Sequence, residues 1–203
     1  NIHSIENSPF RTKFEKDVEK MRGNICIGCI SDTDPQPIMV RSKLGLYAVC
    51  SIGIIQNAKA LSEELLESGC ANFETMSSGN INSGGLIGAL IAQKPTFVEG
   101  IRYAQSKIEG TMSLVIMTED SIICARDRAG KLPILIGKRS DGYCFSFESF
   151  AYQKLGYETC HELKAGEITC LTKDGYEVLY EGTEEMKICT FLWTYYGLSL
   201  IHI

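Results

Sequence analysis

The apolar residues of the first half recur three and four positions apart, which is the spacing of one face of a helix. Three helices are predicted from this spacing. The first lies between Asn57, a residue type that favours helix starts, and Gly69, a residue type that favours helix ends. The second covers residues 83–93 and stops before Pro95. The third begins after Thr96, which forms a capping-box pattern with the Glu three positions later.

Runs of β-branched and apolar residues predict strands elsewhere. Residues 24–30 and 37–55 have this character, with a turn in the second run at 41–45. Strand-like runs joined by short turns dominate the second half, and two of these turns contain Asp-Gly, a strong hairpin signal. Connections this short require antiparallel pairing. The predicted strands cover residues 112–117, 121–126, 133–138, 143–147, 167–171 and 176–180.

Several of these strands are apolar on both faces, including residues 114–117 and 134–136. An antiparallel sheet with one face in water would alternate polar and apolar residues, so these sheets are expected to be covered on both sides. The predicted fold class is α+β, a four-layer αββα sandwich in which two antiparallel sheets are flanked by helices. Four side chains are expected in its core: Leu114, Ile116, Ile123 and Ile136.

Composition narrows the classes of function. The 203 residues include 20 basic and 25 acidic side chains, a net charge of −5, and no basic stripe typical of nucleic-acid binding. No apolar run reaches the length of a membrane span. The first residues, 1–6, lack the pattern of a signal peptide, so a cytoplasmic protein is expected, with neither nucleic acid nor membrane as partner. Its nine cysteines are then expected to be free thiols.

Two motifs resemble binding or redox sites, but each also has a purely structural interpretation. Cys26 and Cys29 form a CxxC, but they alternate in an apolar run without companion ligands. Buried strand cysteines are therefore favoured over a metal or redox site. The glycine-rich residues 77–85 precede a helix and could cradle a phosphate. They lack the Gly-Lys-Ser/Thr of a nucleotide loop, so a loop with a helix cap is the preferred reading.

Charged candidates also have ordinary explanations. Asp32 and Asp34 lie among prolines and are expected in a solvated turn. Residues 126–133 offer charges and a glycine, but a hairpin turn is favoured, with positive φ at Gly130. His161 lacks a nearby nucleophile and is expected on the surface. From the residues alone, no convincing catalytic centre emerges.

An ordered set of motifs resembles a known family. Residues 110–117 match its Gly-x-x-Ser-Leu-Val, 126–137 its Arg-Asp-x-x-Gly-x-x-Pro-Leu, 145–151 its Ser-Glu-Ser-x-Ala and 165–168 its Pro-Gly-Glu. Together they resemble the class II glutamine amidotransferase domain of amidophosphoribosyltransferase. The resemblance extends over residues 20–197, and residues 187–196 are similar to the strand that leads into the phosphoribosyltransferase domain.

The resemblance implies an N-terminal-nucleophile hydrolase fold and glutamine hydrolysis. In that family a cysteine at the mature N-terminus attacks the side-chain amide, and ammonia passes to a C-terminal phosphoribosyltransferase domain. No cofactor is expected in the amidotransferase domain, and a homo-oligomer is compatible with the family. We expect residues 1–197 to be this domain without its first strand and nucleophile, and 198–203 to fall outside it. With no initiator Met at Asn1, the sequence is expected to be a fragment truncated at both ends.

The substrate-binding positions depart from the family pattern. Ser31 aligns with the arginine that holds the substrate carboxylate, and Ser83 with the aspartate that binds the ammonium. Ile52 aligns with the asparagine of the oxyanion hole, and only Gly53 of that pair is retained. These departures predict a degenerate glutaminase site. Two alternatives remain: an active glutaminase that supplies ammonia for phosphoribosylamine synthesis in purine biosynthesis, and a non-catalytic structural or regulatory module.

Overall fold

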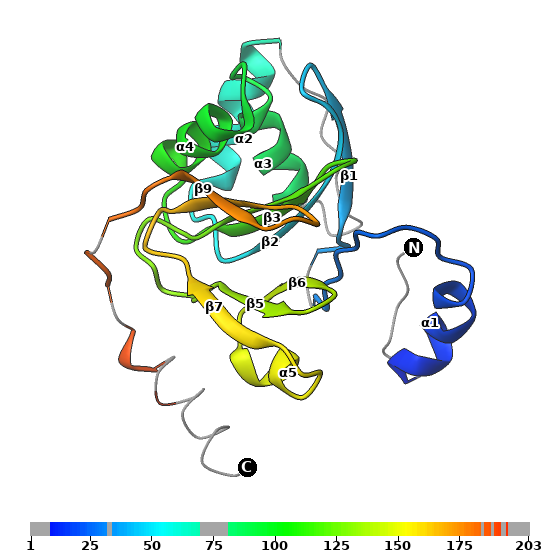
Figure 1. Ribbon diagram of the computed structural model, residues 1–203. Coiled ribbons are helices and arrows are strands. Elements are labelled where there is room, and N and C mark those ends of the chain that lie inside the picture. Colours follow the sequence, from blue (N-terminus) through cyan, green and yellow to red (C-terminus); the bar gives the residue numbers. More distant parts are fainter. Residues whose placement is uncertain are drawn as a thin grey trace.

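Two antiparallel β-sheets and their helices make up the computed structural model, which describes residues 9–31, 34–69, 81–183, 185–187, 189–191 and 194. Figure 1 shows the layers, with α2, α3 and α4 above the larger sheet, the smaller sheet below it, and α5 at the bottom. The elements in chain order are α1 (Phe10–Val18), β1 (Ile38–Ser42), β2 (Gly45–Ile52), α2 (Ala58–Glu67), α3 (Ser83–Ile91), α4 (Phe97–Lys107), β3 (Ser113–Met117), β4 (Ile122–Ala125), β5 (Leu135–Arg139), β6 (Gly142–Ser146), α5 (Ser149–Gln153), β7 (Glu158–Glu162), β8 (Ile168–Leu171) and β9 (Tyr176–Tyr180).

The larger sheet has six strands in the order β1-β2-β3-β4-β8-β9, and every pair is antiparallel. Its helix-facing side packs on α2, α3 and α4 to form the main core, in which Leu86, Leu114 and Ile116 are completely buried. The Thr96 hydroxyl accepts a hydrogen bond from the Glu99 N–H and caps α4, as predicted. The apolar spacing read from the sequence therefore identified the helix faces correctly.

The smaller sheet has three strands in the order β6-β5-β7, also antiparallel, and packs against the other face of the larger sheet. Val115 and Cys124 of the larger sheet meet Ile134 and Ile136 in a second buried cluster between the sheets. The predicted α+β, αββα sandwich is confirmed, and the four residues expected in the core are buried. Side chains of one strand thus serve two cores, which is why the strands are apolar on both faces.

Some elements differ from the prediction. Residues 24–30 lie outside the described strands, although Ile27 packs against the cluster between the sheets. Their alternating pattern buries one side chain but does not by itself provide the backbone pairing that defines a strand. The sequence reading also missed β7, α5 and α1, and Figure 1 shows α1 standing apart from the layers.

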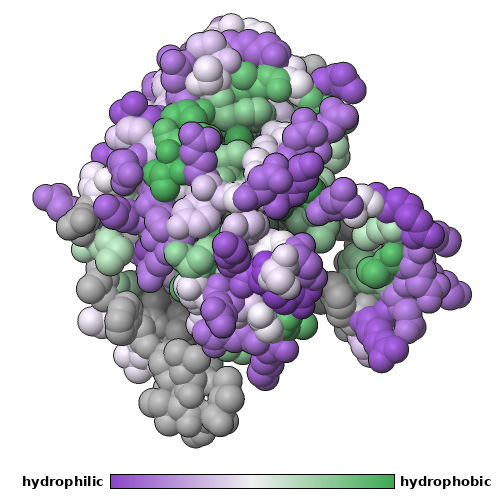
Figure 2. Space-filling model, in the orientation of Figure 1, coloured by the Kyte–Doolittle hydropathy of each residue, from purple (hydrophilic) through white to green (hydrophobic). Residues whose placement is uncertain are grey.

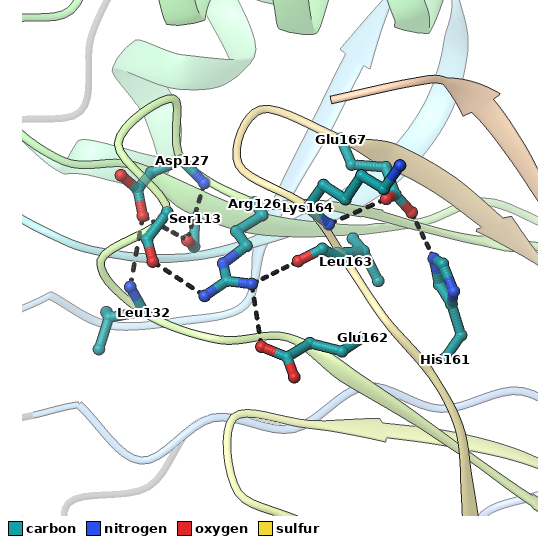
Figure 3. A network of polar contacts seen from close by, with 10 residues as sticks. Ser113, Arg126, Asp127, Leu132, His161, Glu162, Leu163, Lys164 and Glu167 are labelled. Carbon is teal, nitrogen blue, oxygen red and sulfur yellow. Dashed lines mark hydrogen bonds and ion pairs between the residues drawn. The ribbon is translucent and has the colours of Figure 1, made fainter. Parts of the chain in front are cut away.

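The turn after β4 is not the hairpin that was expected. β4 pairs with β3 and β8, whereas β5 pairs with β6 and β7, so residues 126–134 cross from one sheet to the other. Figure 3 shows how buried Arg126 holds this crossover. Its guanidinium donates to the carbonyl oxygens of Gly130 (2.9 Å) and Leu163 and to the Glu162 carboxylate (3.2 Å). Gly130 has the expected positive φ, +62°.

The visible surface in Figure 2 is mostly hydrophilic, with apolar residues gathered over the helix layer. Among the described residues, no helix has the length and apolar character needed to cross a bilayer. The predicted tail 198–203 lies outside the described residues.

Candidate functional site

The four substrate-position residues named from the sequence, Ser31, Ile52, Gly53 and Ser83, line a single cavity of about 440 Å³. They come from three separate segments: the loop before β1, the end of β2 and the first turn of α3. Phe145 of the smaller sheet also lines the cavity, which therefore lies at one end of the space between the sheets. Tertiary structure brings together positions that are up to 52 residues apart in the chain.

Gly53 has a structural reason to be glycine. It follows β2 with φ +142°, in the region that favours glycine. A Cβ atom at this position would collide with the Thr111 carbonyl oxygen. Ile52 beside it is 38% exposed and offers the cavity an apolar side chain. The end of β2 therefore has the backbone conformation that requires Gly53, but Ile52 presents no side-chain amide to the cavity.

Asp34 also lines the cavity, although the sequence analysis assigned it to a solvated turn. Its carboxylate is 8% exposed and accepts a hydrogen bond of 3.0 Å from the Ser83 N–H at the start of α3. The solvated turn expected for Asp34 is therefore wrong, because a helix N-terminus attracts a carboxylate. The Ser31 hydroxyl accepts a hydrogen bond of 3.1 Å from the Asp34 N–H and stabilises this loop. Asp32 lies outside the described residues.

The cavity has one acidic side chain and no basic one among its described lining residues, since Asp34 is accompanied by no Lys, Arg or His. Its other lining residues are apolar, small or uncharged, apart from the thiols of Cys29 and Cys50. Among these described residues, a ligand ammonium group meets an opposite charge, whereas a ligand carboxylate meets none. The described lining is thus electrostatically one-sided.

Both thiols line the cavity, and their interaction changes both pKa values. The interaction with Cys50 lowers the pKa of Cys29 to about 7, against the opposing effect of burial. The same interaction, followed by burial and the charge of Cys29, raises the pKa of Cys50. Cys29 is exposed and Cys50 is buried. The expectation that Cys26 and Cys29 are buried strand residues is wrong, because both are exposed on a segment outside the described strands.

The other candidates from the sequence lie away from this cavity. The surface position expected for His161 is wrong, because its side chain is half-buried against two partners. Its Nε2 lies 2.5 Å from the buried Glu167 carboxylate, and its ring stacks on Tyr176. The described part of the glycine-rich stretch, residues 81–85, forms the cap of α3, where the Asn82 side chain accepts from the Gly85 N–H. A larger cavity of about 900 Å³ lies near Asp127 and contains none of the four substrate positions.

All eight described cysteines are free thiols, and Cys70 lies outside the described residues. Within the described residues, no three His, Cys, Asp or Glu side chains gather as metal ligands.

Comparison with known proteins places the chain in a family. Residues 21–153 match the family model described as a glutamine amidotransferase domain. The chain is 27% identical over 193 residues to an amidophosphoribosyltransferase of Archaeoglobus fulgidus, with 90% of this chain and 42% of that protein covered. It is 30% identical over 167 residues to the enzyme of that name from Synechocystis sp., with 80% and 33% covered.

A solved structure agrees with these matches. Glutamine phosphoribosylpyrophosphate amidotransferase from B. subtilis, complexed with ADP and GMP, superposes with a TM-score of 0.67 at 26% identity, with 79% of this chain and 35% of that chain covered. The chain therefore spans about a third to two-fifths of the length of these relatives. Its sandwich fold, its ordered motifs and these matches show that the chain belongs to the glutamine amidotransferase domain family, in the form found in amidophosphoribosyltransferase-like proteins.

Proposed function

We propose that this domain has lost the ability to hydrolyse glutamine and persists as a degenerate amidotransferase domain of an amidophosphoribosyltransferase-like protein. The supporting observation is the one-sided charge of the 440 Å³ cavity, whose described lining includes Asp34 but no basic side chain. Glutamine presents both a carboxylate and an ammonium. Leaving a buried charge without a partner costs several kcal/mol, so the carboxylate opposes binding.

The replacements at the aligned positions act in the same direction. Ser31 cannot form the two parallel hydrogen bonds of a guanidinium, and its hydroxyl is engaged with the Asp34 N–H. Ile52 supplies no oxyanion donor, and loss of one such donor costs on the order of 10²–10³ in rate. Either loss alone weakens a glutaminase, and the two together remove both binding and transition-state stabilisation.

The test is ammonia release from glutamine by the whole protein, with calorimetric titration of glutamine in parallel. The expected result is no turnover above the buffer rate and no binding at millimolar glutamine. Turnover of about one per second, or a dissociation constant below roughly 1 mM, would show that other residues hold the substrate and would overturn the proposal.

A restoring variant makes the test sharper. Ser31→Arg with Ile52→Asn returns the two family side chains to the cavity and is expected to bring glutamine binding into the measurable range. Ser31→Lys with Ile52→Asn is the matched control, because lysine restores the charge without the bidentate geometry. Equal glutamine affinity of both variants and the unchanged protein would contradict the assignment of these positions.

An active glutaminase with an altered substrate grip is the second candidate, and Asp34 favours it. Its carboxylate lies 3.0 Å from the Ser83 N–H, beside the position where the family has its ammonium-binding aspartate. In this candidate Asp34 holds the ammonium, and ammonia supports phosphoribosylamine synthesis in purine biosynthesis. Asp34→Asn should then raise KM for glutamine by about tenfold or more, whereas a degenerate domain shows no glutamine-dependent rate to lose.

The third candidate is a structural or regulatory module that positions a neighbouring domain. A C-terminal phosphoribosyltransferase domain is the proposed neighbour, because the longer relatives have amidophosphoribosyltransferase names and this chain covers only part of them. A homo-oligomer is proposed from the family resemblance alone. The test is phosphoribosylamine synthesis by the whole protein with ammonium chloride or with glutamine as the nitrogen source. Synthesis with ammonium chloride but not with glutamine would favour the degenerate domain or the structural module over the active glutaminase.

A further inference from the structure

Two cysteines from separate segments meet on the wall of the cavity. Cys29 belongs to the loop that precedes β1, and Cys50 lies on β2, where it is paired with Val115 of β3. Both side chains line the same cavity of about 440 Å³, and each shifts the pKa of the other. Neither residue is among the aligned substrate positions, and glutamine hydrolysis by the family mechanism does not require either of them.

The two thiols have different access to solvent. Cys29 is exposed, whereas Cys50 is only 8% exposed and is fixed in the six-stranded sheet. A small reagent in solution therefore reaches Cys29 first, and Cys50 lies on the wall of the same cavity. This is the arrangement of an attacking thiol and a resolving thiol.

The interaction with Cys50 also makes Cys29 more reactive, because it lowers the pKa of the Cys29 thiol. This interaction stabilises the Cys29 thiolate and lowers the pKa of Cys29 to about 7. At neutral pH a large fraction of Cys29 is therefore thiolate, the form that attacks electrophiles. Cys50, whose pKa is raised, retains its proton until the second step.

We propose that Cys29 and Cys50 form a redox-active thiol pair that a hydroperoxide converts to a disulfide. The Cys29 thiolate attacks one oxygen of hydrogen peroxide, the O–O bond breaks, and Cys29 sulfenic acid and hydroxide form. The Cys50 sulfur then attacks the sulfenic sulfur, the S–O bond breaks, and the Cys50 proton leaves with the hydroxyl group as water. The two sulfurs together lose two electrons, and the peroxide gains them.

Disulfide formation has a defined structural consequence. The two sulfurs must approach each other to form a bond of about 2.05 Å. β2 is held by β1 and β3 on either side, whereas Cys29 lies on a segment outside the described strands, so the Cys29 loop makes the movement. The bond fastens this loop across the cavity that also contains Ser31 and Ile52. Oxidation therefore changes the shape of the candidate site.

The chain contains a matched control. Cys26 is also exposed and lies on the same segment as Cys29, but it does not line the cavity. After trypsin digestion, Cys26 and Cys29 fall in one peptide, 23–41, and Cys50 in another, 44–59. A Cys26→Ser variant therefore shows which of the two cysteines is joined to Cys50.

The experiment treats the reduced whole protein with stoichiometric hydrogen peroxide, blocks remaining thiols with N-ethylmaleimide and maps the peptides by mass spectrometry. The expected product joins peptides 23–41 and 44–59 with loss of two hydrogen atoms, and dithiothreitol reverses it. The cross-link should persist in Cys26→Ser and disappear in Cys29→Ser. In Cys50→Ser, dimedone should trap the sulfenic acid of Cys29.

Cys29→Ser changes an exposed residue, so it keeps the test valid if Cys50→Ser fails to fold. In the unchanged protein at pH 7, N-ethylmaleimide should react with Cys29 about tenfold or more faster than with Cys26. A cross-link that persists in Cys29→Ser would overturn the proposal. Recovery of Cys29 and Cys50 as separate thiols or separate over-oxidised residues, with no joined peptide, would also overturn it.

Discussion

At the scale of single residues, Glu167 shows how one buried carboxylate can be satisfied. It is 1% exposed and accepts hydrogen bonds from the Lys164 N–H (2.9 Å) and the Thr169 hydroxyl (2.7 Å), and it contacts His161 Nε2 at 2.5 Å. Burial by itself raises the pKa of Glu167, but these contacts outweigh burial and hold the pKa below its ordinary value of 4.5. Glu167 therefore joins a histidine of the smaller sheet to a threonine of the larger one.

Replacing this carboxylate should destabilise the fold. Glu167→Gln keeps the size but removes the charge, and we expect the free energy of unfolding at pH 7 to fall by about 2–4 kcal/mol. Urea unfolding measures the change, and Glu177→Gln on the exposed face of β9 is the control, expected within about 0.5 kcal/mol of the unchanged protein. Equal losses from the two variants would contradict the role of Glu167.

The same group predicts a pH dependence. Because the folded-state pKa of Glu167 is depressed, its stabilising contribution is present above 4.5 and is lost as the pH falls through the folded-state value. The unfolding curves of the protein and of Glu167→Gln should therefore converge as the pH falls below 4.5. If the difference in free energy of unfolding between the two proteins stays constant down to pH 3, the charge of the carboxylate is not what stabilises the fold.

At the scale of elements, the helix layer depends on close contact between α3 and α4. A Cβ atom on Gly100, within α4, would lie 2.5 Å from the Ile91 carbonyl oxygen at the end of α3. Only a glycine lets the two helices approach this closely. The Asn57 side chain adds a second tie: it donates to the Lys107 carbonyl and accepts from the Glu109 N–H instead of capping α2 as the sequence suggested.

Gly100→Ala should force α3 and α4 apart, and we expect a loss of about 1–3 kcal/mol in the free energy of unfolding. Gly85→Ala is the matched control, because Gly85 lies in the first turn of α3 and an added methyl group there meets nothing within 4 Å. Alanine is the better helix former, so Gly85→Ala should be neutral or stabilising by up to about 1 kcal/mol. Thermal unfolding of the two variants should move in opposite directions, and a shared direction would contradict the packing argument.

At the scale of the whole molecule, the two sheets are held together by an apolar cluster, by the crossover at residues 126–134 and by the Glu167 contacts described above. Ile134, Ile136 and Leu163 supply the cluster from the smaller sheet and its connections, and all three are completely buried. The helix layer packs only on the far side of the larger sheet. The smaller sheet thus depends on this interface more than the larger sheet does.

Ile136→Ala should therefore act locally as well as globally. We expect the free energy of unfolding to fall by about 2–5 kcal/mol because the substitution creates a cavity. We also expect faster amide hydrogen exchange in β5, β6 and β7 than in β2 and β3. Ile116→Ala is the control, because Ile116 lies in the core between the larger sheet and the helices. This substitution should instead speed amide hydrogen exchange in the larger sheet. Identical exchange patterns in the two variants would show that the sandwich opens only as a single unit.

The local sequence determined most elements of this protein. Helical spacing and capping residues located α2, α3 and α4, and Asp-Gly turns between apolar runs located the hairpins, because these signals act over a few residues. Apolar residues on both strand faces were enough to predict a sandwich with two cores. Short or polar elements such as β7 and α5 carry too few residues for their pattern to rise above that of a loop.

Only the tertiary structure decided which distant residues meet. It placed Ser31, Ile52, Gly53 and Ser83 around one cavity, turned the expected β4–β5 hairpin into a crossover between sheets, and buried Asp34 against the start of α3. It also placed Cys29 and Cys50 on the wall of one cavity, whereas the CxxC pattern had paired Cys29 with Cys26. Strand pairing and burial depend on contacts between segments far apart in the chain, and a local pattern of residue types does not specify the partner.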